Sequence, residues 1–329
     1  MRILMIGGTR FVGRHIAGAA MARGHQVTLF HRGRTGAGLF PEVEHRYGDR
    51  DTDLSALAEG QWDATVDVCA YLPGQVRALA QTLGERAGHY VLVSTVSVYD
   101  DPPSPGATEA APLVELDDPD VAVVTSETYG GLKVLCERAA VASFGAGTLA
   151  IRPTYVVGPD DYTGRFPHWV ERISRGGEVL LPGPADDPSQ VIDVRDMGAW
   201  IVGLVEAGRA GALHAASPRP PWSWADTMSA IADTVAPAGT TLTWVDAPFL
   251  RAQGVDDRSL PLWSGGDAGR FIFALDPSAA YASGLSPRPL ADTVRDTLAW
   301  LRSPEGAQRQ HVGLSSERED MLLRAWHER

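Results

Sequence analysis

Short apolar runs alternate with longer amphipathic segments along the first 160 residues. Helical periodicity extends to Met21, begins again near Gln75, and covers the region of Tyr129 up to about Ala142. Between these helices lie runs with the length and hydrophobicity of buried strands. Parallel strands need such crossover helices, so the alternation predicts an α/β fold with a doubly wound parallel sheet, a Rossmann architecture. The expected strands occupy residues 1–6, 26–30, a stretch that ends within 45–51, 64–69, 90–93 and 148–151.

Composition narrows the class of protein. The chain has 329 residues, of which 44% are hydrophobic and 21% charged, as in a globular protein of one large or two smaller domains. A net charge of −12 argues against nucleic-acid and anionic membrane partners, which require a basic face. Two cysteines are too few for a disulfide framework, and the N-terminal apolar stretch is too short for a signal peptide. We therefore expect a cytoplasmic protein.

A glycine turn directly follows the first expected strand. Gly7 allows a tight turn, Gly8 lets backbone approach a pyrophosphate, and Gly13 lets the next helix pack closely on the strand. The N-terminus of that helix would face the phosphates. The turn predicts dinucleotide contacts from Gly7, Gly8, Thr9, Arg10, Phe11, Val12 and Gly13.

Arginines follow the second strand, where an NAD-binding chain usually places a carboxylate for the ribose 2′-hydroxyl. Arg32, with Arg10, could clasp a 2′-phosphate, so NADP is favoured over NAD as the cofactor. The Asp49 carboxylate, at the end of the third strand, is placed to accept a hydrogen bond from the adenine amino group. Small residues follow the fourth strand. They could let the adenosine half of the cofactor lie close to the backbone, or they could only pack against their neighbours. The remaining candidates at this end are Asp49, Arg50, Cys69, Ala70 and Tyr71.

Tyr129 and Lys133 lie four residues apart in an expected helix, and Lys133 is the single lysine among 29 basic residues. Residues i and i+4 share a helix face, so the ammonium can lie beside the phenol. One charge at about 4 Å in an effective dielectric near 20 supplies roughly 4 kcal/mol, enough to bring a tyrosine pKa of about 10 near neutrality. Lysine also has donors left for a ribose hydroxyl. The pair predicts tyrosine-based acid/base catalysis.

The fifth expected strand ends in hydroxyl side chains, with Thr95 among them. At the carboxyl edge of a parallel sheet, such a hydroxyl can hydrogen-bond a substrate carbonyl in line with Tyr129.

Together these motifs resemble the extended short-chain dehydrogenases/reductases of the NAD-dependent epimerase/dehydratase family, over nearly the whole chain. The resemblance implies that Thr95 orients the substrate oxygen, Tyr129 transfers a proton and Lys133 holds the nicotinamide ribose. It also implies that Pro153 and Thr154 lie near the nicotinamide. The matching segments are 7–13, Asp49, 94–99, 129–133, 152–153, 158–159 and 191–196.

Three departures from the family pattern bear on the substrate. Arg10 stands where a glycine is common, as in an atypical Gly-Gly-Thr-Arg-Phe branch that includes chloroplast RNA-binding relatives. Val96 and Ser97 occupy places where related sugar dehydratases carry Asp and Glu, so dehydration has no evident acid/base pair. Tyr155 replaces an asparagine that sugar-nucleotide enzymes use near the substrate phosphates. These differences weigh against a nucleotide-sugar substrate.

The resemblance also implies two interleaved domains. Residues 1–160 would form the dinucleotide-binding domain, which also receives a strand and a helix from about 190–210, the strand beginning at Val191. Residues 161–329 would be mainly a smaller substrate-binding lobe. They end in an amphipathic helix after a start signal at Ser315, Ser316 and Glu317.

Eight of the nine tryptophans fall in this second half, where some could wall an apolar or ring-containing substrate and others anchor the core. The histidines show no spacing typical of a metal site. The candidate substrate contacts are Ser97, Tyr155, His168 and Arg270.

These observations predict an NADP-dependent oxidoreductase that moves hydride to or from a small-molecule carbonyl or alcohol, with Thr95, Tyr129 and Lys133 as the catalytic set. One alternative is an epimerase of a sugar or sugar nucleotide that retains its cofactor. Another is an RNA-binding or dinucleotide-sensing protein on the same fold. A homodimer is left open.

Overall fold

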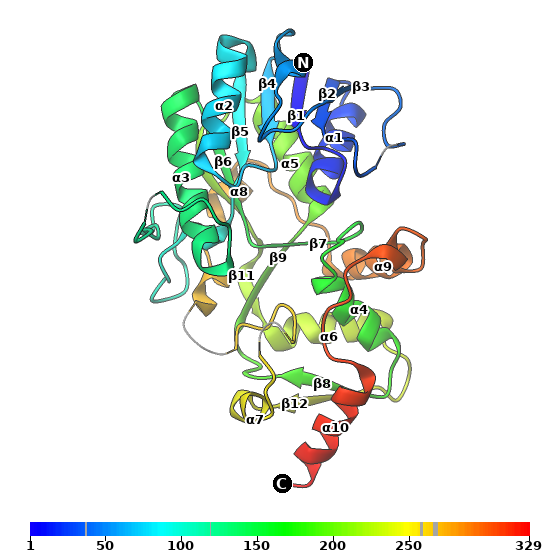
Figure 1. Ribbon diagram of the computed structural model, residues 1–329. Coiled ribbons are helices and arrows are strands. Elements are labelled where there is room, and N and C mark those ends of the chain that lie inside the picture. Colours follow the sequence, from blue (N-terminus) through cyan, green and yellow to red (C-terminus); the bar gives the residue numbers. More distant parts are fainter. Residues whose placement is uncertain (37, 119, 257–258, 266–268) are drawn as a thin grey trace. The chain divides into compact units, whose positions relative to one another are not determined.

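The computed structural model of the chain describes residues 1–36, 38–118, 120–256, 259–265 and 269–329. The described chain forms two compact units (Figure 1). Unit 1 consists of Met1–Thr154, Val194–Ala216 and Leu275–Ser286, and unit 2 consists of Tyr155–Asp193, Ser217–Ala274 and Pro287–Arg329. Residues 275–286, which were expected in the second lobe, thus belong to unit 1.

Unit 1 is built on a seven-stranded sheet in which all neighbouring strands run parallel. The strand order is β10-β6-β5-β4-β1-β2-β3, so the chain begins in the middle and winds outward in both directions. This order confirms the predicted doubly wound parallel sheet. The strands are β1 (Arg2–Ile6), β2 (Gln26–His31), β3 (Glu44–Tyr47), β4 (Ala64–Asp67), β5 (His89–Val93), β6 (Leu149–Pro153) and β10 (Gly211–Ala215).

One strand was assigned to the wrong sheet by the sequence analysis. The buried run that starts at Val191 lies in β9 (Pro188–Asp193), which pairs with β7 and β11 in unit 2. The strand that returns to the main sheet is β10, which pairs with β6. The helix predicted near 190–210 is present as α5 (Val194–Glu206). An apolar run shows that a strand is buried, but not in which sheet.

Helices cover both faces of the sheet in unit 1. Figure 1 shows α2 and α3 on one side of the strands and α1 and α5 on the other. Leu4 and Ile6 of β1 pack with Cys136 of α3 in one apolar cluster. On the other side α1 contacts α5, where a Cβ on Gly198 would lie 3.0 Å from the carbonyl oxygen of His15. The helices are α1 (Phe11–Ala22), η1 (Ser55–Leu57), α2 (Pro73–Leu83), η2 (Gly84–Ala87), η3 (Val96–Val98), α3 (Ser126–Phe144), α5 and α8 (Ser278–Ala282).

Unit 2 has a three-stranded sheet, ordered β11-β9-β7, and a two-stranded sheet of β12 and β8. Its apolar core includes Phe166 and Trp169 of α4 and Met228 of α6. The elements are β7 (Tyr155–Val157), α4 (Arg165–Ser174), β8 (Glu178–Pro182), β9, β11 (Ser217–Ser223), α6 (Trp224–Val235), β12 (Thr241–Val245), α7 (Ala247–Ala252), η4 (Arg270–Phe273), α9 (Leu290–Leu301), η5 (Gly306–Gln308) and α10 (Ser316–His327).

Side-chain hydrogen bonds cap the first turns of α3 and α10. The Thr125 hydroxyl accepts from the backbone N–H of Thr128 at the start of α3. At the start of α10, the Ser315 hydroxyl accepts from the N–H of Arg318, which places the terminal helix where its start signal predicted. Within the described ranges, the helices are all too short or too polar to cross a bilayer.

Candidate active site

The glycine turn between β1 and α1 has the geometry that a phosphate-binding turn requires. Gly7 and Gly8 both have positive φ, +106° and +103°, a region that side-chain-bearing residues rarely adopt. A Cβ on Gly13 would lie 2.6 Å from the backbone nitrogen of Gly8, so only glycine lets α1 begin this close to the turn. The N-cap residue of α1 is Arg10. A guanidinium has no acceptor with which to cap N–H groups, so this helix end suits an anion.

The loop after β2 presents its charges to solvent. Arg32 and Arg34 are exposed, whereas the His31 side chain is buried at 8% exposure. The loop is tied to the glycine turn by a 3.1 Å hydrogen bond between the hydroxyls of Thr35 and Thr9. An imidazole thus occupies the strand end where a ribose-binding carboxylate would be expected, and the exposed groups beside it are cations.

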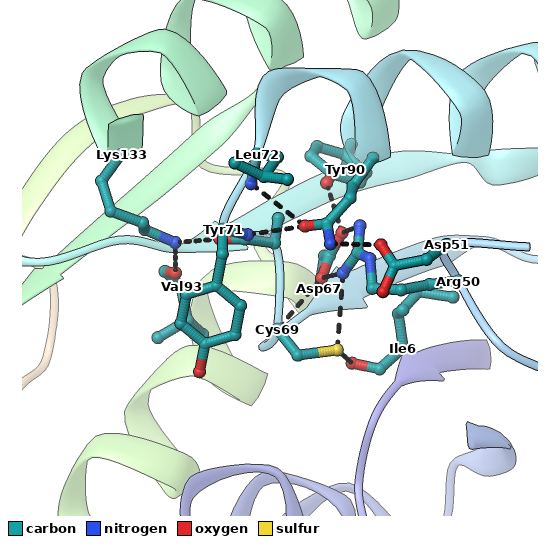
Figure 2. A network of polar contacts seen from close by, with 12 residues as sticks. Ile6, Arg50, Asp51, Asp67, Cys69, Tyr71, Leu72, Tyr90, Val93 and Lys133 are labelled. Atoms are coloured by element: carbon teal, nitrogen blue, oxygen red, sulfur yellow. Dashed lines mark hydrogen bonds and ion pairs between the residues drawn. The ribbon is translucent and has the colours of Figure 1, made fainter. Parts of the chain in front are cut away.

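Arg50, predicted to contact the cofactor, forms a buried ion pair with Asp67 (Figure 2). Two nitrogens of the guanidinium donate to the two carboxylate oxygens at 2.7 and 3.0 Å, and Tyr90 adds a hydroxyl donor to the same carboxylate at 2.9 Å. Burial alone would raise the pKa of Asp67, but the charge and hydrogen bonds of Arg50 outweigh it and lower that pKa. Asp49 lies nearby, half-buried, and accepts from the backbone N–H of Asp51 at 3.1 Å.

Lys133 lies against the backbone at the ends of two strands. Its ammonium donates to the carbonyl oxygen of Ala70, just after β4, at 2.7 Å and to that of Val93, at the end of β5, at 2.8 Å (Figure 2). The side chain is only 2% exposed, and burial lowers the pKa of its amine. An ammonium has three donors, and two are used here. The ring of Tyr71 lies 5.9 Å from the same nitrogen.

Cys69, beside Ala70, belongs to the buried network around Arg50. Its thiol lies 3.4 Å both from a guanidinium nitrogen of Arg50 and from the carbonyl oxygen of Ile6. Burial, followed by the charge of Asp67, raises the pKa of this thiol. Cys69 is therefore held as a neutral packing group.

Tyr129 lies in the first turn of α3, one helical turn before Lys133, and is half-buried. Its ring centroid is 6.5 Å from that of Tyr71. The two glycines that follow explain how α3 comes so near the end of β5. A Cβ on Gly130 would lie 2.1 Å from the carbonyl oxygen of Ser97, and one on Gly131 would lie 2.4 Å from the Leu116 side chain.

Thr95 caps the short turn η3 that follows β5. Its hydroxyl accepts from the backbone N–H of Ser97 and donates to the Ser97 hydroxyl, both at 3.1 Å. Because Gly130 brings α3 against this turn, the hydroxyls of Thr95 and Ser97 and the helix turn of Tyr129 and Lys133 gather at the carboxyl edge of the sheet. Pro153 and Thr154, at the end of β6, are buried, and Thr154 donates its backbone N–H to Ala215 of β10.

A buried network that the sequence did not predict lies behind this edge. Glu137, one turn beyond Lys133 on α3, accepts from the Ser94 hydroxyl at 2.5 Å and forms a two-point ion pair with Arg152 of β6. Arg152 also donates to the Tyr99 hydroxyl, which lies 2.5 Å from Nε2 of His214. The network joins β5, β6, α3 and β10 directly behind Thr95. The spacing Tyr129, Lys133, Glu137 was a signal for it.

In unit 2, the predicted substrate residues divide between two places. The Tyr155 ring stacks on Phe273, with centroids 4.4 Å apart, and both line a hollow together with Trp224, Trp263 and Asp187. Arg270 pairs with Asp187 at 3.3 Å.

His168 does not line this hollow. Its ring packs against Gly313, where a Cβ would lie 2.1 Å from the ring, and burial followed by the charge of Arg175 lowers its pKa to about 4. His168 is therefore a neutral packing residue rather than a substrate contact of the hollow.

Comparison with known proteins shows what the chain is similar to. Residues 70–215 match the model of the NAD dependent epimerase/dehydratase family. A curated relative, the chloroplast stem-loop binding protein of 41 kDa b of Arabidopsis thaliana, is 27% identical over 220 residues, which are 62% of this chain and 55% of that protein. The chain thus spans about half the length of this relative.

Solved structures share the fold. WbmH from Bordetella bronchiseptica, crystallised with NAD+, is 19% identical with a TM-score of 0.69, over 92% of this chain and 99% of that chain. UDP-glucose 4-epimerase from Thermus thermophilus, crystallised with NAD, is 17% identical with a TM-score of 0.65, over 92% of this chain and all of that chain. Residues 70–215 are thus similar to the NAD dependent epimerase/dehydratase family, and the solved structures show that the chain shares its fold with NAD-bound proteins.

Proposed function

We propose that the protein is an NADP-dependent oxidoreductase that transfers hydride to or from a small-molecule carbonyl or alcohol. The observation that carries the proposal is the placement of Lys133, a buried ammonium held by two backbone carbonyls one helical turn from Tyr129. A nicotinamide cofactor supplies the hydride chemistry when bound. The third donor of Lys133 is suited to a ribose hydroxyl, and its charge favours the phenolate of Tyr129.

Each side chain has a part in handling the proton. Thr95, fixed by Ser97 and the turn η3, would hydrogen-bond the substrate oxygen. Tyr129 would give its hydroxyl proton to that oxygen in reduction and take it back in oxidation. Glu137 and Arg152 keep the end of β5 in place through Ser94, so the Thr95 hydroxyl is presented from a fixed backbone.

The preference for NADP rests on the loop after β2. The exposed guanidiniums of Arg32 and Arg34 suit a 2′-phosphate, and no carboxylate occupies the strand end, since His31 is there. Arg32→Ala should weaken NADPH binding far more than NADH binding in a fluorescence titration. Equal losses, or a wild-type preference for NADH, would show that the chain uses NAD, with which the similar structures were crystallised.

In unit 2, Tyr155, Trp224 and Phe273 supply aromatic faces around a hollow of only about 10 Å³, which has room for about one water molecule. This hollow therefore does not define the size or the class of the substrate.

The catalytic assignment is tested with NADPH and a panel of carbonyl compounds. Tyr129→Phe and Lys133→Met should each lower turnover by roughly 10²- to 10⁴-fold, as loss of general acid/base catalysis does. The double variant should be little worse, because groups that act as a unit lose their effect together. Tyr281→Phe is a control that should retain turnover. If both single variants kept wild-type turnover, the assignment would be wrong.

Two other functions are supported by particular observations. Similar structures named as epimerases support an epimerase, which would retain its cofactor through purification. The stem-loop binding relative supports RNA binding, against which the net charge of −12 weighs. A dinucleotide that copurifies would favour the epimerase, and a salt-dependent mobility shift with single-stranded or stem-loop RNA at submicromolar protein would favour RNA binding.

A further inference from the structure

We propose that His31 and His45 form a hydrogen-bonded relay that holds the loop after β2 in the shape that receives the adenosine ribose of the dinucleotide, and that the relay is intact only while both imidazoles are neutral. The inference rests on the dinucleotide-binding function proposed above. It adds a positioning role for His31, at the end of β2, and for His45 of β3.

The direction of each hydrogen bond in the relay follows from its first donor. The backbone N–H of Gly33 donates to Nδ1 of His31 at 3.0 Å, so this nitrogen carries no proton and the neutral ring is protonated at Nε2. That Nε2 lies 2.8 Å from Nδ1 of His45 and must donate to it. The second ring is therefore also protonated at Nε2, which donates to the carbonyl oxygen of Phe40 at 3.0 Å.

The relay joins two points on the same loop. Gly33 lies two residues after β2 and Phe40 four residues before β3, and both have left-handed backbone, with φ of +70° and +54°. A Cβ on Gly33 would lie 3.2 Å from the Tyr47 ring, so the backbone rests on that ring. The exposed Arg32 is the residue that precedes Gly33. The two histidines thus link Gly33 to Phe40 through hydrogen bonds, while Arg32 and Arg34 are exposed to solvent.

A proton added to either ring breaks the relay. On His31 it would lie on Nδ1, facing the Gly33 N–H, and on His45 it would lie on Nδ1, facing the Nε2–H of His31. In each case two donors would face each other. Burial, followed by the nearby His45, lowers the pKa of His31, so the buried ring resists protonation until the solution is distinctly acidic.

An aromatic ring, two exposed cations, one ion pair and one exposed carboxylate lie around the two rings or next to them along the chain. The Tyr47 ring meets His31 edge to face at 5.1 Å and stacks on His45 at 6.3 Å. The adjacent loop contributes the cations Arg32 and Arg34. The other titratable residues of β3 are Glu44 and Arg46, which pair with each other at 2.8 Å. The preceding Glu42 is exposed.

The test compares cofactor affinity with pH in matched variants. In His31→Asn, the amide oxygen can take the Gly33 N–H but does not titrate. From pH 8 to pH 5, the affinity of the wild-type protein for NADPH should fall further than that of His31→Asn, by roughly three- to tenfold, the range of one lost hydrogen bond. The 2′-phosphate titrates near pH 6 in both measurements and cancels in the comparison. His311→Gln, which changes an exposed histidine of unit 2, should behave as the wild type.

Long-range ¹H–¹⁵N NMR of the free protein reads the relay directly. We expect both rings in the Nε2–H form at pH 8. A proton on Nδ1 of His31, titration of His31 like an exposed histidine, or the same pH dependence in wild type and His31→Asn would overturn the relay. A preference for NADH at pH 8 would contradict only the choice of NADP, and the same comparison of variants would then be made with NADH.

Discussion

Two buried cations lie on either side of the Cys69-Ala70 turn in unit 1, and they are held in opposite ways (Figure 2). Arg50 faces the carboxylate of Asp67. Lys133 donates its hydrogen bonds to two uncharged carbonyls, those of Ala70 and Val93. Burial disfavours both charges, but the charge and hydrogen bonds of Asp67 outweigh it and raise the pKa of Arg50, whereas burial lowers the pKa of Lys133.

The contrast separates a cation with a charged partner from one held by uncharged carbonyl groups, the one that we propose to take part in catalysis. A guanidinium paired at two points is fixed and cannot give up its proton. The Lys133 ammonium, held by two carbonyl dipoles, keeps one donor and a charge that no ion pair neutralises, and Tyr129 lies one helical turn before it on α3. Such a site is costly to build, because the charge is desolvated without a counter-ion. The cost is consistent with a functional role for Lys133.

The largest expected effect is on stability, from breaking the paired cation. Asp67→Asn leaves the Arg50 charge buried without a counter-ion, so the free energy of unfolding should fall by about 3–5 kcal/mol. Urea denaturation followed by circular dichroism would measure it. In the double variant Arg50→Met, Asp67→Leu, only part of that loss should be recovered, because no charge is buried but the Tyr90 hydroxyl and the Cys69 N–H lose their acceptor. A matched exposed pair gives the control: Asp292→Asn, which removes the partner of Arg295 on α9, should cost at most about 0.5 kcal/mol.

If Asp67→Asn cost no more than Asp292→Asn, the Arg50 pair would not be a structural element, and the comparison with Lys133 would lose its meaning.

A smaller effect is expected in the dependence of stability on pH. The pKa of Asp67 is lower in the folded than in the unfolded chain, so its contribution is fully present above the unfolded value of about 4 and is lost as pH falls through the folded value. Unfolding midpoints measured from pH 6 to pH 2 should therefore decline less steeply in the Arg50→Met, Asp67→Leu variant than in the wild type. Parallel declines would assign acid sensitivity to other carboxylates.

The sequence could predict the parts of this site that are local along the chain. The sheet followed from apolar runs, the glycine turn from its position after β1, and the Tyr129 and Lys133 pair from helical spacing. Partners that lie far apart in sequence were not predictable. Asp67 is an ordinary member of a buried strand until the fold brings Arg50 to it, and His45 meets His31 only through the register of β2 and β3. The Val191 run was placed in the wrong sheet for the same reason, since strand pairing is set by tertiary structure.

The smallest expected effect on stability comes from replacing Lys133, the cation that forms no ion pair in the described structure. Lys133→Met keeps the length of the side chain and removes a desolvated charge, so the free energy of unfolding should change by no more than about 1 kcal/mol, in either direction. Because the folded pKa of Lys133 lies below its unfolded value of about 10.4, the unfolded chain holds more protons between those two values, and wild-type stability should rise with pH up to the unfolded value. Unfolding midpoints from pH 8 to pH 10.5 should lack this rise in Lys133→Met. The same variant should lose hydride transfer. A loss of stability as large as that of Asp67→Asn would instead identify Lys133 as a second structural cation, held by its carbonyls for the sake of the turn, and the catalytic role would have to be sought in Tyr129 and Thr95 alone.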